Sequence, residues 1–400
     1  MSPGFHRPAE AGSHTPCWRR LQAAAVLAVA VCAAVGLRAR DEVRALWVVR
    51  SSLTSPQAID TMVAAAQQSG FNTLLLQVRG LGDSYFLNGI EPRPLALASQ
   101  PAFDPLADAI AKAHARGLAV HAWIDVDLVA GTDIPLDRQH IAHRHPEWLM
   151  VPRAIAADLA TLDPAGPEYL GRLTRFARAK APELDGLYLS PATAASVDYT
   201  TSVVRDIVQR YSVDGVHLDY LRYPSADFEY GRETLSAFRR ATGIADPDAA
   251  PDRWRAFRMD RLTALLTELR RAIKAARPSA TVSVAVAPEP RLASTEYLQD
   301  IARWLSGDLM DVVCATPYTS DGATFVSQLA AAQAEAGGHA LWAGIGANQL
   351  STEQTLDNIQ AARRLGIGGI ILFSYDGLIA PARGSGYLSQ LGKAAFGAQF

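Results

Sequence analysis

Along residues 216–221, large apolar residues alternate with a second set that includes His217 and Asp219. A period of two residues is typical of a β-strand, whose successive side chains point to opposite faces. The turn-forming pair Asp214-Gly215 precedes this strand. If the apolar set packs against helices, His217 and Asp219 point to the other side, and Asp219 lies near the carboxyl end of the strand. Enzymes built on barrels and open α/β sheets place their chemistry at that end.

Seven further segments carry strand patterns, and helical segments separate them. The strands are predicted at residues 45–50, 72–79, 118–125, 281–286, 311–318, 341–348 and 368–376. Helix starts are marked where Ser55 or Asp104 precedes a proline as an N-cap, and where Ser351 and Gln354 can form a capping box. Strands that alternate with helices predict a parallel sheet, and eight of them predict closure into a (β/α)8 TIM barrel. A doubly wound open sheet is the alternative that periodicity leaves open.

About ninety residues separate the third predicted strand from the fourth, which is longer than the usual connection in such folds. This segment contains predicted helices at 167–180 and 197–210 and a short strand-like run, GLYLSP. We interpret it as an enlarged loop after strand 3 rather than as a second domain. The barrel is therefore expected to occupy residues 41–400.

Residues 1–40 form a separate segment. Arg19-Arg20 precedes an apolar, alanine-rich run at 21–37, and Arg38 and Arg40 follow that run. A basic start and a short apolar run are typical of a signal peptide, and the run is rather short for a membrane span. We expect export to the periplasm or another extracytoplasmic location, followed by either cleavage or anchoring through residues 21–37. Contact with a membrane is expected only through this segment.

Composition and charge describe an ordinary globular protein, with 20% charged residues and a formal net charge of −2. They give no sign of a basic face, so no nucleic-acid partner is predicted. Of the three cysteines, Cys17 and Cys32 lie in the N-terminal segment and Cys314 stands alone in the predicted barrel. The barrel therefore lacks the cysteines for an internal disulfide or a cysteine zinc cluster. We expect a monomer.

Polar residues recur where the predicted strands end. The set expected to converge on one mouth of the barrel is Arg50, Arg79, Asp125, Asp219, Glu289, Tyr318, Asn348 and Asp376. Carboxylates, arginines and aromatic rings in one cup suit a sugar, because rings stack on its C–H surfaces and charged groups bind its hydroxyls. Glycoside cleavage needs two carboxyl groups, one of them protonated. We predict that Asp219 is essential, that Glu289 is its partner, and that Asp125 is the reserve for that role.

Substrate contact is predicted for a second group: Arg50, Arg79, Asp83, Trp123, His217, Arg222, Tyr318, Asn348 and Asp376. For several of these residues a structural role is an alternative to substrate contact. Arg79 and Asp83 could instead tie down the long loop after the second strand, and Trp123 could fill the barrel. His217 could be a core histidine with a local partner, and Asp219 could be satisfied by Arg222 or by backbone amides.

A metal ion is considered for His140, His143 and His145, which lie in the loop RQHIAHRHPEWLM. Their spacing is not the helical i, i+4 pattern, and no carboxylate is placed with them. We therefore assign no metal site and no cofactor.

Several motifs, in order along the chain, resemble one family. WVVR, LLLQVRGLGDSYF with GIEPRP, FDPLADAIAKAHARGLAVHAWI, HPEWL and RYSVDGVHLDYLRYP resemble the bacterial glycosyl hydrolase-like 10 barrels, from about Val43 to the final strand, GIILFSYDGL. The resemblance implies an exported or lipid-anchored barrel that acts on cell-wall glycan, similar in some members to enzymes that cut peptidoglycan glycan strands. Two features depart from the family pattern. Asp125 stands where that pattern has Asn, and the seventh strand ends in GAN, without a carboxylate.

The sequence therefore predicts a glycoside hydrolase of cell-envelope polysaccharide, with peptidoglycan glycan strands as its substrate. One alternative is a non-catalytic glycan-binding or scaffolding barrel, which the missing carboxylate on the seventh strand favours. The other is metal-assisted deacetylation or hydrolysis through the histidine loop.

Overall fold

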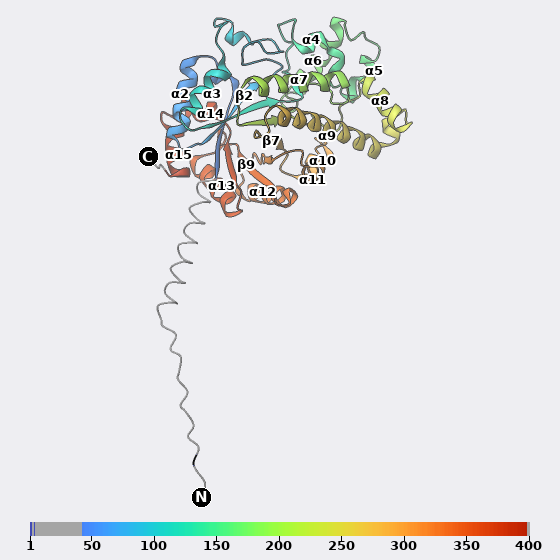
Figure 1. The fold of residues 1–400 in the computed structure, drawn as a ribbon. Helices are drawn as coiled ribbons and strands as arrows, with labels where there is room; N and C mark the ends of the chain where they lie inside the picture. The colour runs from blue at the N-terminus through green and yellow to red at the C-terminus, as the bar shows by residue number, and fades with distance from the viewer. Residues whose placement is uncertain (2–3, 5–41, 398–400) are drawn as a thin grey trace. The chain divides into compact units, whose positions relative to one another are not determined.

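Eight parallel strands close into a barrel in the computed structural model, which describes residues 1, 4 and 42–397 (Figure 1). In chain order the barrel strands are β1 (Val43–Val48), β2 (Thr73–Arg79), β3 (Ala119–Asp125), β6 (Gly215–Asp219), β7 (Thr281–Val286), β8 (Val312–Ala315), β9 (Ala340–Ile345) and β10 (Gly369–Leu372). The first strand pairs with both the last strand and the second, which closes the barrel. The predicted TIM barrel is confirmed, and each of the eight predicted segments overlaps one of its strands.

Helices cover the outside of the barrel (Figure 1). They are α2 (Pro56–Gln68) after β1, α3 (Pro105–His114) after β2, α7 (Ala194–Arg210) before β6, α8 (Arg232–Thr242) and α9 (Pro251–Ala276) after β6, α10 (Pro290–Thr295) and α11 (Ile301–Ser306) after β7, α12 (Gly322–Ala336) after β8, α13 (Thr352–Arg364) after β9, and α14 (Tyr375–Leu378) and α15 (Tyr387–Phe396) after β10. The side chains of Ser55 and Asp104 cap α2 and α3, and Ser351 and Gln354 form the predicted capping box of α13.

The connection between β3 and β6 is the enlarged loop that the sequence predicts. It contains the antiparallel pair β4 (Leu128–Ala130) and β5 (Leu187–Tyr188), which precedes α7. Between these two strands the chain forms the helices α4 (Ile141–Arg144), α5 (Ala156–Leu159) and α6 (Pro167–Ala179). Its first residues continue alongside β6, because the Val126 backbone N–H donates to the Asp219 carbonyl at 2.7 Å. The loop therefore begins at the carboxyl end of the barrel and brings β4 and β5 next to that end.

The apolar core has two layers, one on each side of the sheet. The outer layer lies between the sheet and the helices and includes Val216 and Leu218. The inner layer fills the barrel and consists of Ala45, Trp47, Leu75, Trp123, Val312, Cys314, Trp342 and Ile371. His217 belongs to the inner side, with its ring centroid 5.6 Å from that of Trp47. The alternation predicted for β6 is therefore present up to Asp219.

Residues 43–397 belong to one compact unit. The predicted signal or anchor segment, residues 1–40, falls outside the described residues except at positions 1 and 4. Among the helices of the described part, none is long and apolar enough to cross a membrane.

Candidate active site

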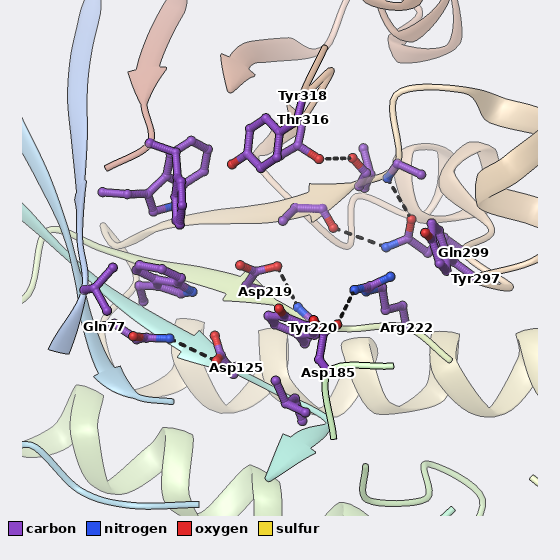
Figure 2. Close-up of a pocket in the computed structure, with 18 of the residues that line it drawn as sticks. Gln77, Asp125, Asp185, Asp219, Tyr220, Arg222, Tyr297, Gln299, Thr316 and Tyr318 are labelled. Carbon is purple, nitrogen blue, oxygen red and sulfur yellow. Dashed lines mark hydrogen bonds and ion pairs between the residues drawn. The ribbon is translucent and has the colours of Figure 1, made fainter. Parts of the chain in front are cut away.

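A cavity of about 620 Å³ opens at the carboxyl ends of the barrel strands (Figure 2). Of the strand-end residues expected to converge there, Arg50, Asp125, Asp219 and Tyr318 line it, and so do Trp123 and Arg222. Further polar and aromatic side chains in its wall are Trp47, Gln77, Asp185, Tyr220, Tyr297, Gln299, Thr316 and Phe373. The cavity falls within the size range of small-molecule sites.

Asp125 and Asp219 are the last residues of the neighbouring strands β3 and β6, and they are register partners in that parallel pair. Partners on adjacent strands have backbones about 4.8 Å apart and side chains on the same face of the sheet. Figure 2 shows the two carboxyl groups reaching the same cavity from these two strands. Two acids in such a position repel each other when both are ionised, so one of them tends to keep a proton.

Asp125 is the more buried of the two, with 2% of its surface exposed. Its Oδ2 accepts a hydrogen bond from Gln77 Nε2 at 3.0 Å, whereas its Oδ1 is buried without a partner in the described chain. Burial raises the pKa of Asp125 well above its usual range, and the nearby Asp219 carboxylate adds to the rise; Arg50, Arg79 and the Gln77 bond counteract only part of it. Asp125 is therefore suited to carry a proton near neutral pH.

Asp219 is partly exposed to the cavity and has stronger support for its charged form. Its Oδ1 accepts a hydrogen bond from the Tyr220 backbone N–H at 2.7 Å. Burial raises the pKa of Asp219, while that N–H, Arg222 and the Trp123 indole hold the increase back. The pair thus combines a strongly raised pKa at Asp125 with a more moderately raised one at Asp219, which is the asymmetry that acid–base catalysis requires.

The backbone turns sharply directly after Asp219. Tyr220 has a φ of 50°, a left-handed conformation that is uncommon for a residue with a side chain. The turn aims the Tyr220 N–H at the Asp219 carboxylate and brings the Tyr220 ring into the cavity wall. The local conformation therefore supplies both a hydrogen bond to the acid and an aromatic contact surface.

Aromatic rings form one wall of the cavity. Trp47 from β1 makes edge contacts with Tyr318 and Phe373, with centroid distances of 6.5 and 6.0 Å, and Trp123 contacts Phe373 at 6.3 Å. Gly344 on β9 makes room for this group, because a Cβ there would lie 2.8 Å from the Trp47 ring. Tyr318 is 46% exposed and can therefore meet a ligand directly. Such a wall suits stacking against the C–H faces of sugar rings.

Arg222 organises a second part of the wall. Its guanidinium carbon lies 5.0 Å from the Tyr220 ring centroid and 4.5 Å from that of Tyr297, and its Nη2 is 3.3 Å from Asp185 Oδ2. Figure 2 shows this pairing beside Asp219. Arg222 therefore fixes two rings and a carboxylate around the cavity while it lowers the cost of a charge on Asp219.

Several predicted contact residues lie near the mouth but outside the cavity wall. Arg79 is fully buried: it forms a bidentate pair with Glu91, with bonds of 2.8 and 2.7 Å, and it donates to the Asp125 and Val126 carbonyls. It therefore supports the strand end under Asp125 rather than facing a ligand. His217 is also fully buried and shares a 2.9 Å hydrogen bond with Ser283 Oγ.

Asp376, Asn348 and Asp83 are likewise not part of the wall of this cavity. Asp376 Oδ2 accepts from the Val49 backbone N–H at 2.8 Å, which ties the end of β1 to α14, the helix that follows the last strand. Asn348 donates its backbone N–H to the Phe373 carbonyl at 2.9 Å. Asp83 accepts from two backbone N–H groups of its own loop and lines a separate cavity.

Glu289 does not converge with Asp219, contrary to the sequence-based expectation. Strand β7 ends at Val286, and Glu289 occupies the N-cap position of α10 with an exposed side chain. Its Oε1 accepts a hydrogen bond from Gln328 Nε2 on α12 at 2.8 Å. The neighbouring Pro288 still lines the cavity, but the Glu289 side chain is bonded to α12 instead. Asp125 is therefore the carboxyl group that stands beside Asp219.

The three histidines of the long loop are engaged separately. His140 donates to the Leu81 carbonyl at 2.8 Å, His143 donates to the Pro135 carbonyl at 2.6 Å, and His145 stacks on Trp148 with a centroid distance of 3.7 Å. Within residues 42–397 no group of three or more His, Cys, Asp or Glu side chains is placed to hold a metal ion. The arrangement gives the metal-assisted alternative no support.

Some cavity residues were missed by the sequence analysis. Trp47 and Gln77 follow the same inward parity as Asp219, so strand alternation could have found them. Strand alternation places Tyr220 on the outer face, but its left-handed φ breaks the alternation after Asp219 and the ring lines the cavity. Asp185 and Tyr297 come from segments outside the barrel strands, and no local pattern in the sequence marks them.

Comparison with known sequences shows a family match. A family model described as "Glycosyl hydrolase-like 10" matches residues 42–175 and 172–340. "Glycosyl hydrolase DigH" of Escherichia coli (strain K12) is 25% identical over 297 residues, which cover 66% of this chain and 58% of that protein. "Glycosyl hydrolase YngK" of Bacillus subtilis (strain 168) is 24% identical over 230 residues, which cover 53% of this chain and 36% of that protein. The chain thus spans less than two thirds of either relative.

Solved structures share the fold at low sequence identity. The glycoside hydrolase domain of PgaB (BpsB) from Bordetella bronchiseptica aligns with a TM-score of 0.62 and 14% identity, over 86% of this chain and 97% of that one. Alpha-L-fucosidase isoenzyme 2 from Paenibacillus thiaminolyticus aligns with a TM-score of 0.59 and 18% identity, over 89% of this chain and 49% of that one. Both comparisons agree with the barrel observed here.

Proposed function

Because the chain belongs to the glycosyl hydrolase-like 10 family and places two acids side by side at the ends of β3 and β6, we propose that it is a glycoside hydrolase whose catalytic pair is Asp219 and Asp125. The observation that carries the proposal is the register pairing of these two residues in the wall of one cavity. Paired carboxyl groups with different proton affinities are the basic requirement for glycoside cleavage.

The two acids have different roles in the proposed reaction. Asp125, with its strongly raised pKa, gives its proton to the glycosidic oxygen that leaves. Asp219, whose charge is supported by the Tyr220 N–H and by Arg222, attacks the anomeric carbon as that bond breaks. Water then attacks the same carbon and releases Asp219, and Asp125 takes back a proton from that water. No cofactor enters these steps.

The proposed substrate is a cell-envelope polysaccharide, with peptidoglycan glycan strands as the specific candidate. An aromatic wall beside the carboxyl pair suits a chain of sugar rings, and Arg222 and Asp185 offer a donor and an acceptor for hydroxyl groups. The name "Glycosyl hydrolase" of both relatives agrees with this class of reaction. We also propose an exported protein, on the basis of the basic and apolar pattern of residues 19–40.

A panel of three variants tests the proposal on glycan strands from which the peptides have been removed. Asp219→Asn and Asp125→Asn should each retain the fold by circular dichroism and lose on the order of a hundredfold or more in rate. Glu289→Gln is the matched control, because Glu289 is an exposed carboxylate outside the cavity, and it should cleave as fast as the parent.

Two results would count against the proposal. One is a folded Asp219→Asn variant that cleaves at the parent rate, which would exclude Asp219 from catalysis. The other is a parent protein that binds the glycan strands and leaves their length unchanged. That second result would select the non-catalytic glycan-binding or scaffolding barrel, which the absence of a carboxylate in the GAN sequence after β9 favours.

A further inference from the structure

A second cavity, of about 790 Å³, adjoins the candidate active site. Leu81 and Asp185 line both cavities, so the two adjoin each other at these side chains. The second cavity lies between the loop after β2 and the loop after β4, which contribute residues 92–95 and 131–137 respectively. His140 joins the two loops, because its ring donates to the Leu81 carbonyl at 2.8 Å. A ligand longer than the first cavity can therefore extend into a preformed groove.

The rim of this groove is aliphatic and unusually exposed. Leu136 is 83% exposed, Leu95 75% and Ile134 43%, and all three line the groove. Large apolar side chains from two separate loops, left exposed around one hollow, mark a binding surface more often than an ordinary stretch of surface. No Phe, Tyr or Trp lines the groove. The groove therefore lacks the ring-stacking wall of the first cavity and suits small apolar groups such as methyls.

The polar lining of the groove consists mainly of hydrogen-bond acceptors. Asp83 and Asp137 each use one oxygen to accept backbone N–H groups and form no salt bridge with a residue of the described chain. Asp133 and Asp185 pair with arginines that are not part of the groove lining. The cation that lines it, Arg93, donates to three backbone carbonyls. The second carboxylate oxygens of Asp83 and Asp137 therefore remain able to accept hydrogen bonds from the N–H and O–H donors of a ligand in the groove.

We propose that this groove binds further units of the polysaccharide whose cleavage is proposed above, and that these units are N-acylated hexosamines. Their N-acyl methyl groups contact Leu95, Ile134 and Leu136, and their amide N–H and hydroxyl groups donate to Asp83 and Asp137. The inference rests on the proposed function for the identity of the polymer. It adds that recognition extends beyond the carboxyl pair and selects for the N-acyl group.

Binding to the full chain carrying Asp219→Asn tests the inference without any need for turnover. The probes are N-acetylglucosamine oligosaccharides of increasing length and the same oligosaccharides after removal of the acetyl groups, and calorimetry measures the affinity. Affinity should increase with length beyond the units that fill the first cavity. The double change Leu95→Ser and Leu136→Ser, added to this background, should weaken the long acetylated probes by roughly tenfold and leave the shortest probe unaffected.

Val326→Ser provides the matched control, since Val326 is 38% exposed on α12 and lines neither cavity. This control should bind every probe like the Asp219→Asn parent. Affinity that does not depend on length, tighter binding of the deacetylated probes, or an equal loss in the Val326 variant would each overturn the inference. Failure of the proposed hydrolysis would be seen separately, because a barrel that binds without cleaving would still show the length dependence in this assay.

Discussion

Gln77 donates a hydrogen bond from Nε2 to Asp125 Oδ2 at 3.0 Å. The orientation of the Gln77 amide is set from its other side, where Oε1 accepts from the Arg50 backbone N–H and from Arg50 Nη1, each at 3.4 Å. Arg50 fits closely here, because a Cβ at Gly80 would lie 2.0 Å from its Nη1. Since Oδ2 already accepts a bond, the proton of a neutral Asp125 belongs on Oδ1, which has no partner in the described chain. Gln77 is thus a positioning residue for the proposed acid.

Gln77→Leu should therefore change the pH profile as well as the rate. The Gln77 bond favours the charged form of Asp125 and lowers its pKa, so its removal raises that pKa further. The alkaline limb of kcat/KM should move to higher pH, and the rate at the optimum should fall roughly tenfold because the acid is weaker and less well oriented. Thr316→Val, a change in the same cavity wall away from Asp125, should leave the limb in place. A limb that moves to lower pH would contradict this assignment.

Asp125→Asn should make the protein more stable while it abolishes activity. The folded-state pKa of Asp125 lies well above its ordinary 3.8, so the folded protein binds this proton more tightly than the unfolded chain does. The free energy of unfolding therefore decreases as pH rises from about 3.8 to the raised pKa. Asn has no such proton, so the variant should melt roughly 2 °C or more above the parent at pH 7, with the difference disappearing at low pH. A variant that melts lower at every pH would refute the idea.

Arg222 allows charge and stacking to be separated with two substitutions. Arg222→Met removes a cation that holds down the pKa of Asp219, so the acid limb of the pH profile should move to higher pH. Arg222→Lys keeps the charge and loses the planar contact with Tyr220 and Tyr297, so KM should rise several-fold while the acid limb stays near its original position. Both effects are measured by determining kcat and KM of each variant over a range of pH. Equal profiles for the two variants would show that the charge of Arg222 does not reach Asp219.

Much of the barrel could be predicted because its pattern is local. Each strand has a two-residue alternation and each helix a recognisable start, as at Ser55 and Ser351, and these signals survive in any tertiary context. The same alternation placed Asp219 and Asp125 at the mouth. It failed one residue later, because the left-handed φ of Tyr220 ends the regular strand geometry.

The partner of Asp219 could not be identified from periodicity, for a different reason. Glu289 follows β7 by three residues, and where its side chain points depends on the turn into α10 rather than on strand parity. Asp125 and Asp219 are far apart in the sequence, and only the parallel pairing of β3 with β6 makes them neighbours. Asp185 and Tyr297 reach the cavity through connections whose course no local pattern encodes.

The location of the mature protein is a separate prediction. Because residues 19–40 combine basic flanks with an apolar run, a reporter enzyme joined after residue 45 should be active only outside the inner membrane. Replacing two residues of the run at 21–37 with Arg should abolish that activity, because the apolar region is then interrupted. Equal activity of a reporter that works only in the cytoplasm would reverse the prediction.

The stereochemical outcome follows from the spacing of the two acids. Carboxyl groups that flank the scissile bond lie about 5–5.5 Å apart in retaining glycosidases and about 6.5–9.5 Å apart in inverting ones, which need room for a water molecule. Asp125 and Asp219 end adjacent paired strands, whose backbones are about 4.8 Å apart, and carboxyl groups that keep the spacing of their strands match the retaining arrangement. We therefore expect the first product to keep the anomeric configuration of the bond that is cleaved.

Proton NMR of the anomeric signal during the first minutes of cleavage measures this configuration directly, before the free sugar equilibrates. A retaining reaction also passes through a covalent sugar ester on Asp219. A slowly turned-over fluorosugar substrate should therefore leave its mass on the peptide that contains Asp219 in the parent, and on no peptide of the Asp219→Asn variant. Product of the opposite configuration would mean that Asp219 activates a water molecule instead, and that the carboxyl groups of the working pair lie further apart than their strands.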